Sequence, residues 1–270
     1  MYFNPITDLN KATILISNDD GINARGIKLL EKILSTICPD VWVVAPSREK
    51  SGASHAITSD TLRSMAGHSS AESFPNVIRQ LDEKHFSVDG TPSDCVRIAL
   101  SMIMKDHKPN LIVSGINNGR NIADDITYSG TIGVAVEGLL HGVMSVAVSQ
   151  LTDGAEVVNW QLAEIYLPDI IKKVCSQAYQ ADCLINVNFP NVETDKIGGI
   201  KICRHGTRRF LPASTEIKRM CLSNLSGEYI NDSPYPDDNI EIQKGNITLS
   251  ALSINLTDYC ENQKLASLFE

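Results

Sequence analysis

Four short polar segments of the sequence carry side chains suited to binding a cation or a phosphate group. They are NDDG at 18–21, PSREKSGAS at 46–54, SGINNG at 114–119 and DDITYSGT at 124–131. The first three follow apolar runs that predict strands, and the fourth leads into a helical pattern. Because ligands of open parallel sheets bind beyond the carboxyl ends of the strands, we expect these segments to meet at one edge of a sheet.

Asp19 and Asp20 are adjacent, and two ionised carboxylates at a crowded strand end repel each other unless a cation compensates them. Their hard oxygen atoms suit Mg²⁺, Mn²⁺ or Ca²⁺ better than zinc. Taken alone, Asp-Asp-Gly also fits a solvated turn or a helix N-cap. The neighbouring segments favour a metal site, because Ser51 and Asn117 offer neutral ligands that leave positions open for water and substrate.

Ser129, Gly130 and Thr131 open a predicted helix, where hydroxyl and backbone N–H groups at the positive end of the helix dipole attract anions. An ordinary helix cap by Ser129 or Thr131 explains the same residues equally well. Arg48 and Lys50 in the second segment offer another contact for phosphate, or form a basic surface loop.

Several other ligand motifs are missing from the sequence. No GxGxxG follows a strand, no GxSxG is present, and the glycines near residue 21 lack the Lys-Ser/Thr pair of a P-loop. The seven cysteines form no CxxC pair, and the six histidines are scattered. The sequence therefore indicates neither a zinc site nor a disulfide framework.

The periodicity of apolar residues predicts alternating strands and helices. Strands are expected at 13–17, 41–45, 86–88, 111–114, 145–149 and 184–188, and helices at 27–37, from 91 to about 103, at 131–140 and at 159–178. Such βαβ units imply a parallel sheet with right-handed crossovers. Beyond residue 200 alternation replaces helical periodicity, as at 246–256, and 223–239 has the composition of a loop. We expect an α/β core over about 12–195 and a β-rich C-terminal extension over about 196–270.

Composition restricts the classes of function. The chain has 270 residues, 43 % of them hydrophobic, and a net charge of −8, which disfavours binding to the backbone of a nucleic-acid polymer. Its apolar runs are too short to span a bilayer, and its N-terminus lacks the pattern of a secretory signal. We expect a cytoplasmic protein without a membrane partner.

Taken together, the motifs resemble those of the SurE family, the stationary-phase survival proteins. The matching stretches are ILISNDDGINARGI (14–27), VVAPSREKSGASHAIT (43–58), VDGTPSDCV (88–96), LIVSGINNGRNIADDITYSGTIGVAVEG (111–138) and LINVNFP (184–190), with weaker echoes at RHGTRRF (204–210) and GNITLSALSINLTD (245–258). Arg25 and Ala123 depart from the Pro and Gly that are common in the family. Neither position is a ligand in the predicted site.

The resemblance implies a single domain over 1–270: a Rossmann-like, three-layer α/β core with a mostly parallel sheet, and a C-terminal arm exchanged in a homodimer or homotetramer. It also implies a 5′/3′-nucleotidase that depends on one divalent cation, Mg²⁺ or Mn²⁺. Carried over by motif, the catalytic residues are Asp19 and Asp20, and the metal ligands are Asp19, Asp20, Ser51 and Asn117. The residues that would bind the substrate phosphate are Asn118, Ser129, Gly130 and Thr131, with Tyr128 nearby.

The expected reaction is hydrolysis of a nucleoside monophosphate by in-line attack at phosphorus. Asp19 or Asp20 takes the proton of the attacking water, or one of them attacks directly; the sequence does not choose. Two alternatives remain open at this point. One is a phosphatase of broader specificity or an exopolyphosphatase, and the other is a non-catalytic nucleotide-binding oligomer.

Overall fold

The computed structural model describes residues 2–58, 77–152, 154–155, 157–206 and 233–269. Its strands are β1 Thr13–Ser17, β2 Asp40–Pro46, β3 Ile78–Gln80, β4 His85–Val88, β5 Leu111–Asn118, β6 Met144–Gln150, β7 Cys183–Phe189, β8 Gly199–Ile202 and β9 Asn246–Ser253. Its α-helices are α1 Arg25–Leu34, α3 Pro92–Ile98, α4 Gly130–Leu140, α5 Gln161–Cys175, α6 Asp238–Gln243 and α7 Tyr259–Ala266. Short 3₁₀ turns lie at Leu9–Lys11, Ala123–Thr127 and Thr194–Lys196, and a π-helical turn at Ala99–Ile103.

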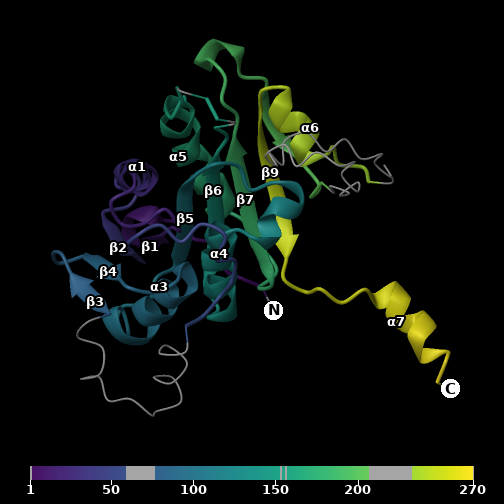
Figure 1. The fold of residues 1–270 in the computed structure, drawn as a ribbon, viewed down its shortest axis with the longest axis horizontal. Coiled ribbons are helices and arrows are strands. Elements are labelled where there is room, and N and C mark those ends of the chain that lie inside the picture. The colour runs from purple at the N-terminus through teal and green to yellow at the C-terminus, as the bar shows by residue number, and fades with distance from the viewer. Residues whose placement is uncertain (1, 59–76, 153, 156, 207–232, 270) are drawn as a thin grey trace, which may run out of the picture.

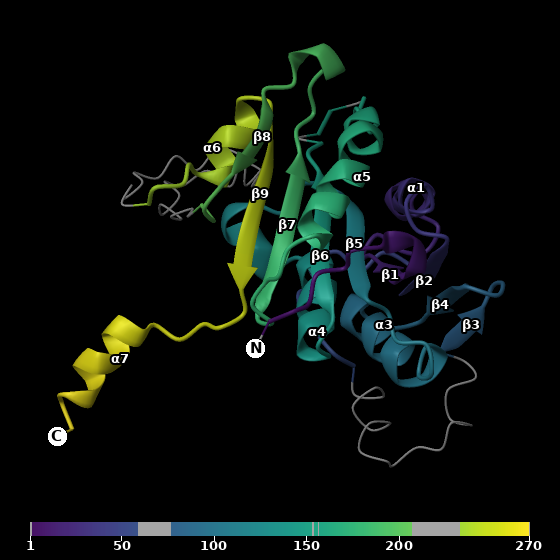
Figure 2. The ribbon, with the colours of Figure 1, turned by 180° about the vertical axis from the view of Figure 1, so that it is seen from behind.

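The strands form one sheet in the order β3-β4-β2-β1-β5-β6-β7-β9-β8. The six from β4 to β7 run parallel, as the βαβ pattern predicts. β3 is antiparallel to β4, and β9 is antiparallel to β7. The chain therefore has the predicted α/β fold with a mostly parallel sheet, and β8 and β9 extend that sheet at its far edge (Figures 1 and 2).

Helices cover both faces of the sheet and make three layers. Successive side chains of a strand point to opposite faces, and in β1 Ile14 and Ile16 pack in the cluster that contains the apolar faces of α1 and α5. Leu15, between them, packs in a second cluster with residues of α3 and α4. All five residues of β1 are buried, which explains why it reads as a continuous apolar run.

The starts of two helices near the carboxyl edge of the sheet follow from the sequence. Thr91 and Asp94 form a capping box at the start of α3, in which each side chain accepts a hydrogen bond from the other residue's backbone N–H. Ser129 caps α4, its Oγ accepting from the backbone N–H of Ile132 at 3.1 Å. Both caps fix the helix end that faces the four polar segments.

Several expectations about the secondary structure were wrong: the short strand β3 was missed, and the helix expected at 159–178 covers only Gln161–Cys175. The strand expected at 111–114 continues to Asn118, because after an irregularity beyond Ser114 the chain pairs again with β6, Asn117 opposite Ser149. Two helices were missed in the C-terminal extension, where α6 and α7 are capped by the side chains of Asp237 and Asp258. Most of the loop expected at 223–239 lies outside the described residues.

Ala123 adopts a backbone conformation that favours glycine. Its φ is +48°, in the left-handed region that a side chain disfavours. The carboxylate of Asp238 accepts the backbone N–H of Ala123 at 3.2 Å and holds this turn against α6.

α7 lies apart from the layered core. Figures 1 and 2 show it at the end of an extended stretch that leaves β9, and all its residues are exposed. None of the helices found in the described residues combines the length and the apolar character needed to cross a membrane.

Candidate active site at the carboxyl edge of the sheet

A tight turn after β1 presents Asp19 and Asp20 at the carboxyl edge of the sheet. The buried side chain of Asn18 holds this turn: its Nδ2 donates to the carbonyl of Gly21 at 3.0 Å, and its Oδ1 accepts the Gly21 N–H at 3.2 Å. Gly21 has a φ of +97°, and a Cβ there would lie 3.1 Å from the backbone of Arg48. Glycine is therefore required for the turn and for the close approach of the loop after β2.

The carboxylate of Asp19 is buried against the first turn of α4. The hydroxyl of Thr131 donates to its Oδ1 at 2.6 Å, and the backbone N–H groups of Gly130 and Thr131 also point to it. A Cβ on Gly130 would lie 2.7 Å from the Cβ of Asp19, so only glycine permits this contact. Burial raises the pKa of Asp19 above its ordinary value, and the hydrogen bonds from α4 offset part of that rise.

Asp20 is less deeply buried and is held from the other side by β5. The backbone N–H of Asn118 donates to its Oδ2 at 3.1 Å. Burial, together with the negative charges of Asp19 and Glu49, raises the pKa of Asp20 to about 6. Asp20 also borders a hollow of about 400 Å³, whose walls are formed by Asp20, Ala24, Arg25, Gly26, Glu49, Asn118 and Trp160. Of the two aspartates, Asp20 is therefore the one that a ligand in this hollow would meet.

The two aspartates have no cationic side-chain partner among the described residues. No Lys, Arg or His there forms an ion pair with either of them, and no group of three or more His, Cys, Asp and Glu residues could hold a metal ion. A cation bound at Asp19 and Asp20 would have to take its other ligands from neutral oxygen atoms and water. Such a set suits Mg²⁺ or Mn²⁺, which keep several waters, better than zinc.

The two predicted neutral ligands lie on the adjacent segments but do not contact the aspartates. Ser51 is exposed, and its hydroxyl donates to Oε1 of Glu49 at 2.7 Å. The Nδ2 of Asn117 donates to the carbonyl of Gly119 at 2.9 Å, so its Oδ1 is not used in that bond. The backbone N–H of Lys50 donates to the carbonyl of Asp19 at 2.7 Å, which brings the loop that carries Ser51 beside the turn.

The other residues predicted to contact the substrate phosphate differ in their exposure to solvent. Thr131 is fully buried and bonded to Asp19, and Ser129 is nearly buried and caps α4. Tyr128 is exposed beside them. Arg48 lies 3.9 Å from a carboxylate oxygen of Asp89, an exposed ion pair.

Three residues that line the hollow beside Asp20 were not predicted from the sequence. They are Glu49, Arg25 and Trp160. Glu49 lies inside a segment singled out for Arg48 and Lys50, and its position next to the turn could have been suspected from the same strand-end argument. Arg25 and Trp160 carry no such signal. The guanidinium of Arg25 lies over the ring of Trp160, 5.4 Å from its centroid, and Trp160 comes from the turn that precedes α5.

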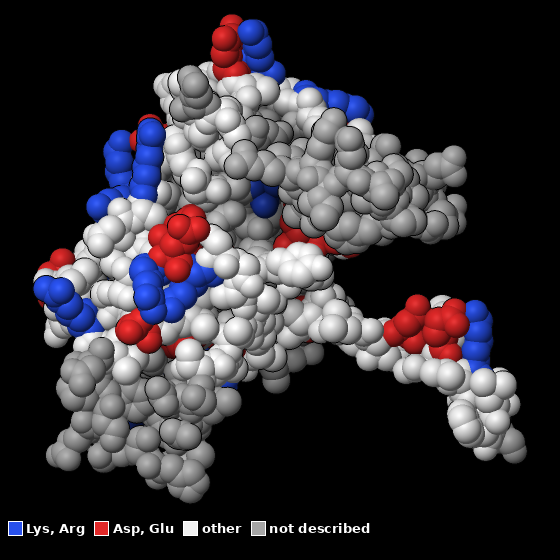
Figure 3. All heavy atoms as spheres, viewed as in Figure 1, with Lys and Arg blue, Asp and Glu red and all other residues white. Residues whose placement is uncertain are grey.

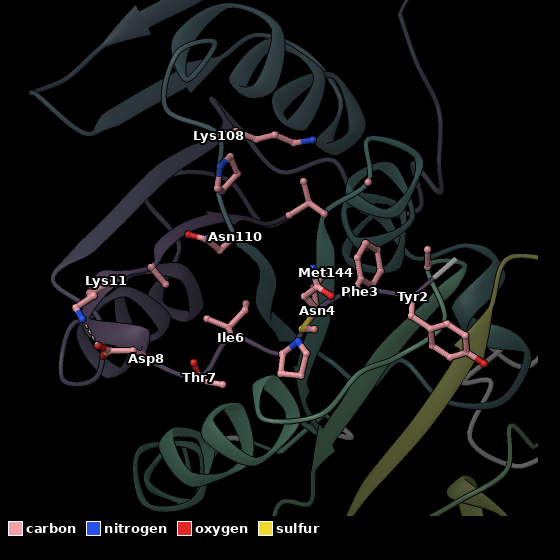
Figure 4. Close-up of a pocket in the computed structure, with 16 residues that line it drawn as sticks. Tyr2, Phe3, Asn4, Ile6, Thr7, Asp8, Lys11, Lys108, Asn110 and Met144 are labelled. Atoms are coloured by element: carbon pink, nitrogen blue, oxygen red, sulfur yellow. Dashed lines mark ion pairs between the residues drawn. The ribbon is translucent and has the colours of Figure 1, made fainter.

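A larger hollow, of about 730 Å³, lies at the opposite edge of the sheet (Figure 4). Its walls come from the N-terminal segment, from the turn before β5 and from the start of β6, all at the amino ends of parallel strands. Its charged groups are already paired: Lys11 lies 3.4 Å from Asp8, and Lys108 donates to the carbonyl of His141. It gathers no reactive side chains.

The described surface carries mixed charge. On the face in Figure 3, Lys and Arg groups lie beside Asp and Glu groups, and no continuous basic stripe crosses the residues drawn there. This distribution offers no track for a nucleic-acid backbone on that face.

Comparison with known proteins gives consistent results. Residues 14–211 match the family described as "Survival protein SurE". A protein of Paramagnetospirillum magneticum named 5′-nucleotidase SurE is 36 % identical over 273 residues, covering the whole of both chains. The 5′-nucleotidase SurE of Rhodospirillum rubrum is 38 % identical over 276 residues, with 99 % of this chain and all of that protein covered.

The fold also has a counterpart of known structure. The crystal structure of the SurE protein from Aquifex aeolicus superposes with a TM-score of 0.75 at 30 % identity, covering 96 % of this chain and all of that one.

Proposed function

The chain belongs to the SurE family, and we propose that it is a divalent-metal-dependent nucleotidase. It is a phosphoric monoester hydrolase that releases phosphate from nucleoside monophosphates. The observation that carries this proposal is the pair Asp19–Asp20 at the carboxyl edge of the sheet, the first buried and the second half-buried, without a cationic partner among the described residues. Because the pair is costly to leave ionised, its arrangement is better explained by cation binding than by folding stability.

We propose Asp19, Asp20, Ser51 and Asn117 as the residues that hold one Mg²⁺ or Mn²⁺ ion. The two carboxylates supply the charge, and the other two side chains supply neutral oxygen atoms from segments next to the turn. When bound, such a cation supplies Lewis-acid assistance to attack at phosphorus.

The residues of the proposed site have different roles. Thr131 and Gly130 fix the carboxylate of Asp19, whereas Asp20 faces the hollow and meets the substrate. Asp20 thus takes the proton from the attacking water or attacks phosphorus itself. We propose that Asn118, Ser129, Gly130 and Thr131 bind the substrate phosphate. The last three stand at the start of α4, where the helix dipole favours negative charge.

Phosphate release tests the reaction class. The purified protein is incubated with a generic aryl phosphate and a panel of 5′- and 3′-nucleoside monophosphates, each with Mn²⁺, Mg²⁺ or EDTA. We expect release that needs a divalent cation and favours nucleotides. Equal rates on sugar phosphates or polyphosphate would replace the nucleotidase by a broader phosphatase. No release from folded protein under any condition would overturn the proposal in favour of a binding protein.

We further propose a cytoplasmic homodimer, or a homotetramer built from it, in which the C-terminal arm after β9 is exchanged between copies. The described cysteines are free, as a reducing compartment favours. Leu256 is 94 % and Phe269 88 % exposed, and such apolar groups on an extended arm favour burial against a second chain.

Light scattering tests the exchange. We expect the full chain to elute as an oligomer and a chain ending at Ser253 to elute as a monomer. An unchanged mass after truncation would contradict the arm's role.

A further inference from the structure

A fully buried carboxylate, Glu137, lies on α4 two turns beyond the proposed site. Its side chain is 0 % exposed, and three cationic or potentially cationic groups surround it. The Nε2 of His55 lies 2.7 Å from Oε2, the Nε2 of His141 lies 3.0 Å from Oε1, and the Nε of Arg97 lies 3.3 Å from Oε1. Burial alone would raise the pKa of Glu137, but the bonds from His141 and His55 and the charge of Arg97 lower it to about 2.

One of these partners belongs to the loop that carries a proposed metal ligand. His55 lies four residues after Ser51, in the segment 47–58, which we call the Ser51 segment. This segment passes directly over the first turns of α4. A Cβ on Gly133 would lie 2.4 Å from the carbonyl oxygen of Ser54 and 3.2 Å from the Cα of His55, so the absence of a side chain permits the contact.

Other bonds fix the Ser51 segment at points on either side of His55. The hydroxyl of Ser54 donates to the carbonyl of Thr127 at 2.7 Å, and its backbone N–H donates to the carbonyl of Tyr128 at 3.1 Å. The hydroxyl of Thr91 donates to the carbonyl of Ala56 at 2.7 Å. The backbone N–H of Thr58 also donates to the buried carboxylate of Asp94 at 3.2 Å. Of these contacts, the one made by His55 joins a side chain of the segment to a carboxylate of α4.

We infer that Glu137, acting through His55, is a positioning residue of the proposed nucleotidase site. It holds the Ser51 segment against α4, the helix whose first turn fixes Asp19 through Thr131. This contact joins the segment that carries Ser51 to the helix that orients Asp19, in addition to the bonds made by Ser54 and Ala56. This inference rests on the proposed function for its catalytic consequence, and on the contacts alone for its structural part.

The chain offers a matched control. His141 and His55 contact the same carboxylate, and their side chains are 30 % and 32 % exposed. His141 follows the last residue of α4, far along the helix from Ser129, and none of its described contacts reaches the site. A purely structural role for Glu137 predicts equal consequences when either histidine is lost.

The experiment compares His55→Leu, His55→Gln and His141→Leu in the full-length protein. Gln keeps an N–H donor that can reach Glu137, so His55→Gln serves as the conservative rescue. For each variant we would measure the melting temperature, the dissociation constant for Mn²⁺ by calorimetry, kcat and KM for a nucleoside monophosphate, and hydrogen exchange of residues 50–58.

We expect both Leu variants to lower the melting temperature by similar amounts. His55→Leu should also reduce kcat and weaken Mn²⁺ binding by roughly tenfold, as loss of groups that orient metal ligands does. It should speed exchange over 50–58, and His55→Gln should restore most of these losses. His141→Leu should leave kcat and the Mn²⁺ dissociation constant close to the wild-type values.

Equal losses of kcat and of Mn²⁺ affinity in the two Leu variants would overturn the inference, and so would unchanged exchange over 50–58 in His55→Leu. Failure of the proposed function gives a different result. In that case the wild-type protein releases no phosphate, while hydrogen exchange still decides whether His55 fixes the segment.

Discussion

The two edges of the same parallel strands carry aspartates in opposite environments. At the carboxyl edge, Asp19 is buried and Asp20 is half-buried, and the pKa of each is raised. At the amino edge, Asp40 begins β2 and accepts hydrogen bonds from the ammonium of Lys84 at 2.7 Å and the hydroxyl of Thr13 at 2.7 Å. The Nε2 of His107 lies 2.6 Å from the same carboxylate. Burial would raise the pKa of Asp40, but these groups hold it well below its usual range.

This difference distinguishes an edge of the sheet that stabilises the fold from an edge that is suited to binding a ligand. The amino edge compensates its carboxylate within the chain, so ionised Asp40 favours the folded state. At the carboxyl edge no described cationic side chain compensates the two carboxylates, which disfavours the folded state unless a ligand from outside binds there. The unfavourable free energy of ionised carboxylates is therefore confined to the edge where the ligand is proposed to bind.

The largest effect should come from exchanging an aspartate for asparagine at each edge. Asp20→Asn should lower phosphate release on the order of a thousandfold, because a charged ligand next to the substrate is lost. The metal-free variant should melt no lower than the wild type, since it removes a destabilising charge. Asp40→Asn should keep its turnover and melt several degrees lower, roughly as a change of 1–2 kcal/mol does. Wild-type turnover in Asp20→Asn would contradict the metal assignment.

Metal binding should stabilise the protein through the carboxyl edge only. At a hundred times its dissociation constant, Mn²⁺ should add about 2.7 kcal/mol to the free energy of unfolding. Thermal unfolding with and without Mn²⁺ should show this shift in the wild type and in Asp40→Asn. The shift should vanish in Asp20→Asn, and its persistence there would place the cation elsewhere.

One threonine at each edge of the sheet donates a hydrogen bond to an aspartate, so the two edges can be compared directly. Thr131 donates to Asp19 at 2.6 Å, and Thr13 donates to Asp40 at 2.7 Å. Thr131→Val should reduce kcat roughly tenfold, since a hydrogen bond to a charged group contributes about 1.5–3 kcal/mol and orients the carboxylate. Thr13→Val should lower stability by a similar free energy and leave kcat unchanged. Steady-state kinetics and urea unfolding on both variants measure the two effects, and equal kinetic losses would remove the distinction between the edges.

The smallest expected effect is a loss of folding stability at acid pH. The pKa of Asp40 in the folded protein lies below its ordinary value of 3.8, so its contribution is present above that pH and is lost as the pH falls below it. Asp40 is partly exposed, so solvent screening limits the contribution to about 1 kcal/mol. Urea midpoints of wild type and Asp40→Asn should therefore differ by a constant amount above about pH 4 and draw together progressively as the pH falls further below 3.8. A difference that does not change between pH 7 and the lowest pH at which both proteins fold would assign the stabilisation to packing.

Much of the fold follows from patterns that act over a few residues. The apolar run of β1 and the Thr91–Asp94 capping box gave elements whose type and position were predicted from local sequence. The end of β5 and the helices α6 and α7 were not. Asn117 and Asn118 were predicted to lie in a loop because their side chains are polar, although their backbone pairs with β6. α6 is too short for its helical period to stand out.

The sequence by itself determined that two adjacent carboxylates follow the first strand and that a hydroxyl-rich segment opens a helix. Both features depend on neighbouring residues, so they can be read without a structure. Only the tertiary structure decided that Thr131 contacts Asp19, 112 residues away, and that His55 contacts Glu137, 82 residues away. Strand order and helix packing choose those partners, because they decide which distant segments come within hydrogen-bonding distance. Periodicity records which face of an element is buried, but it does not record what that face is buried against.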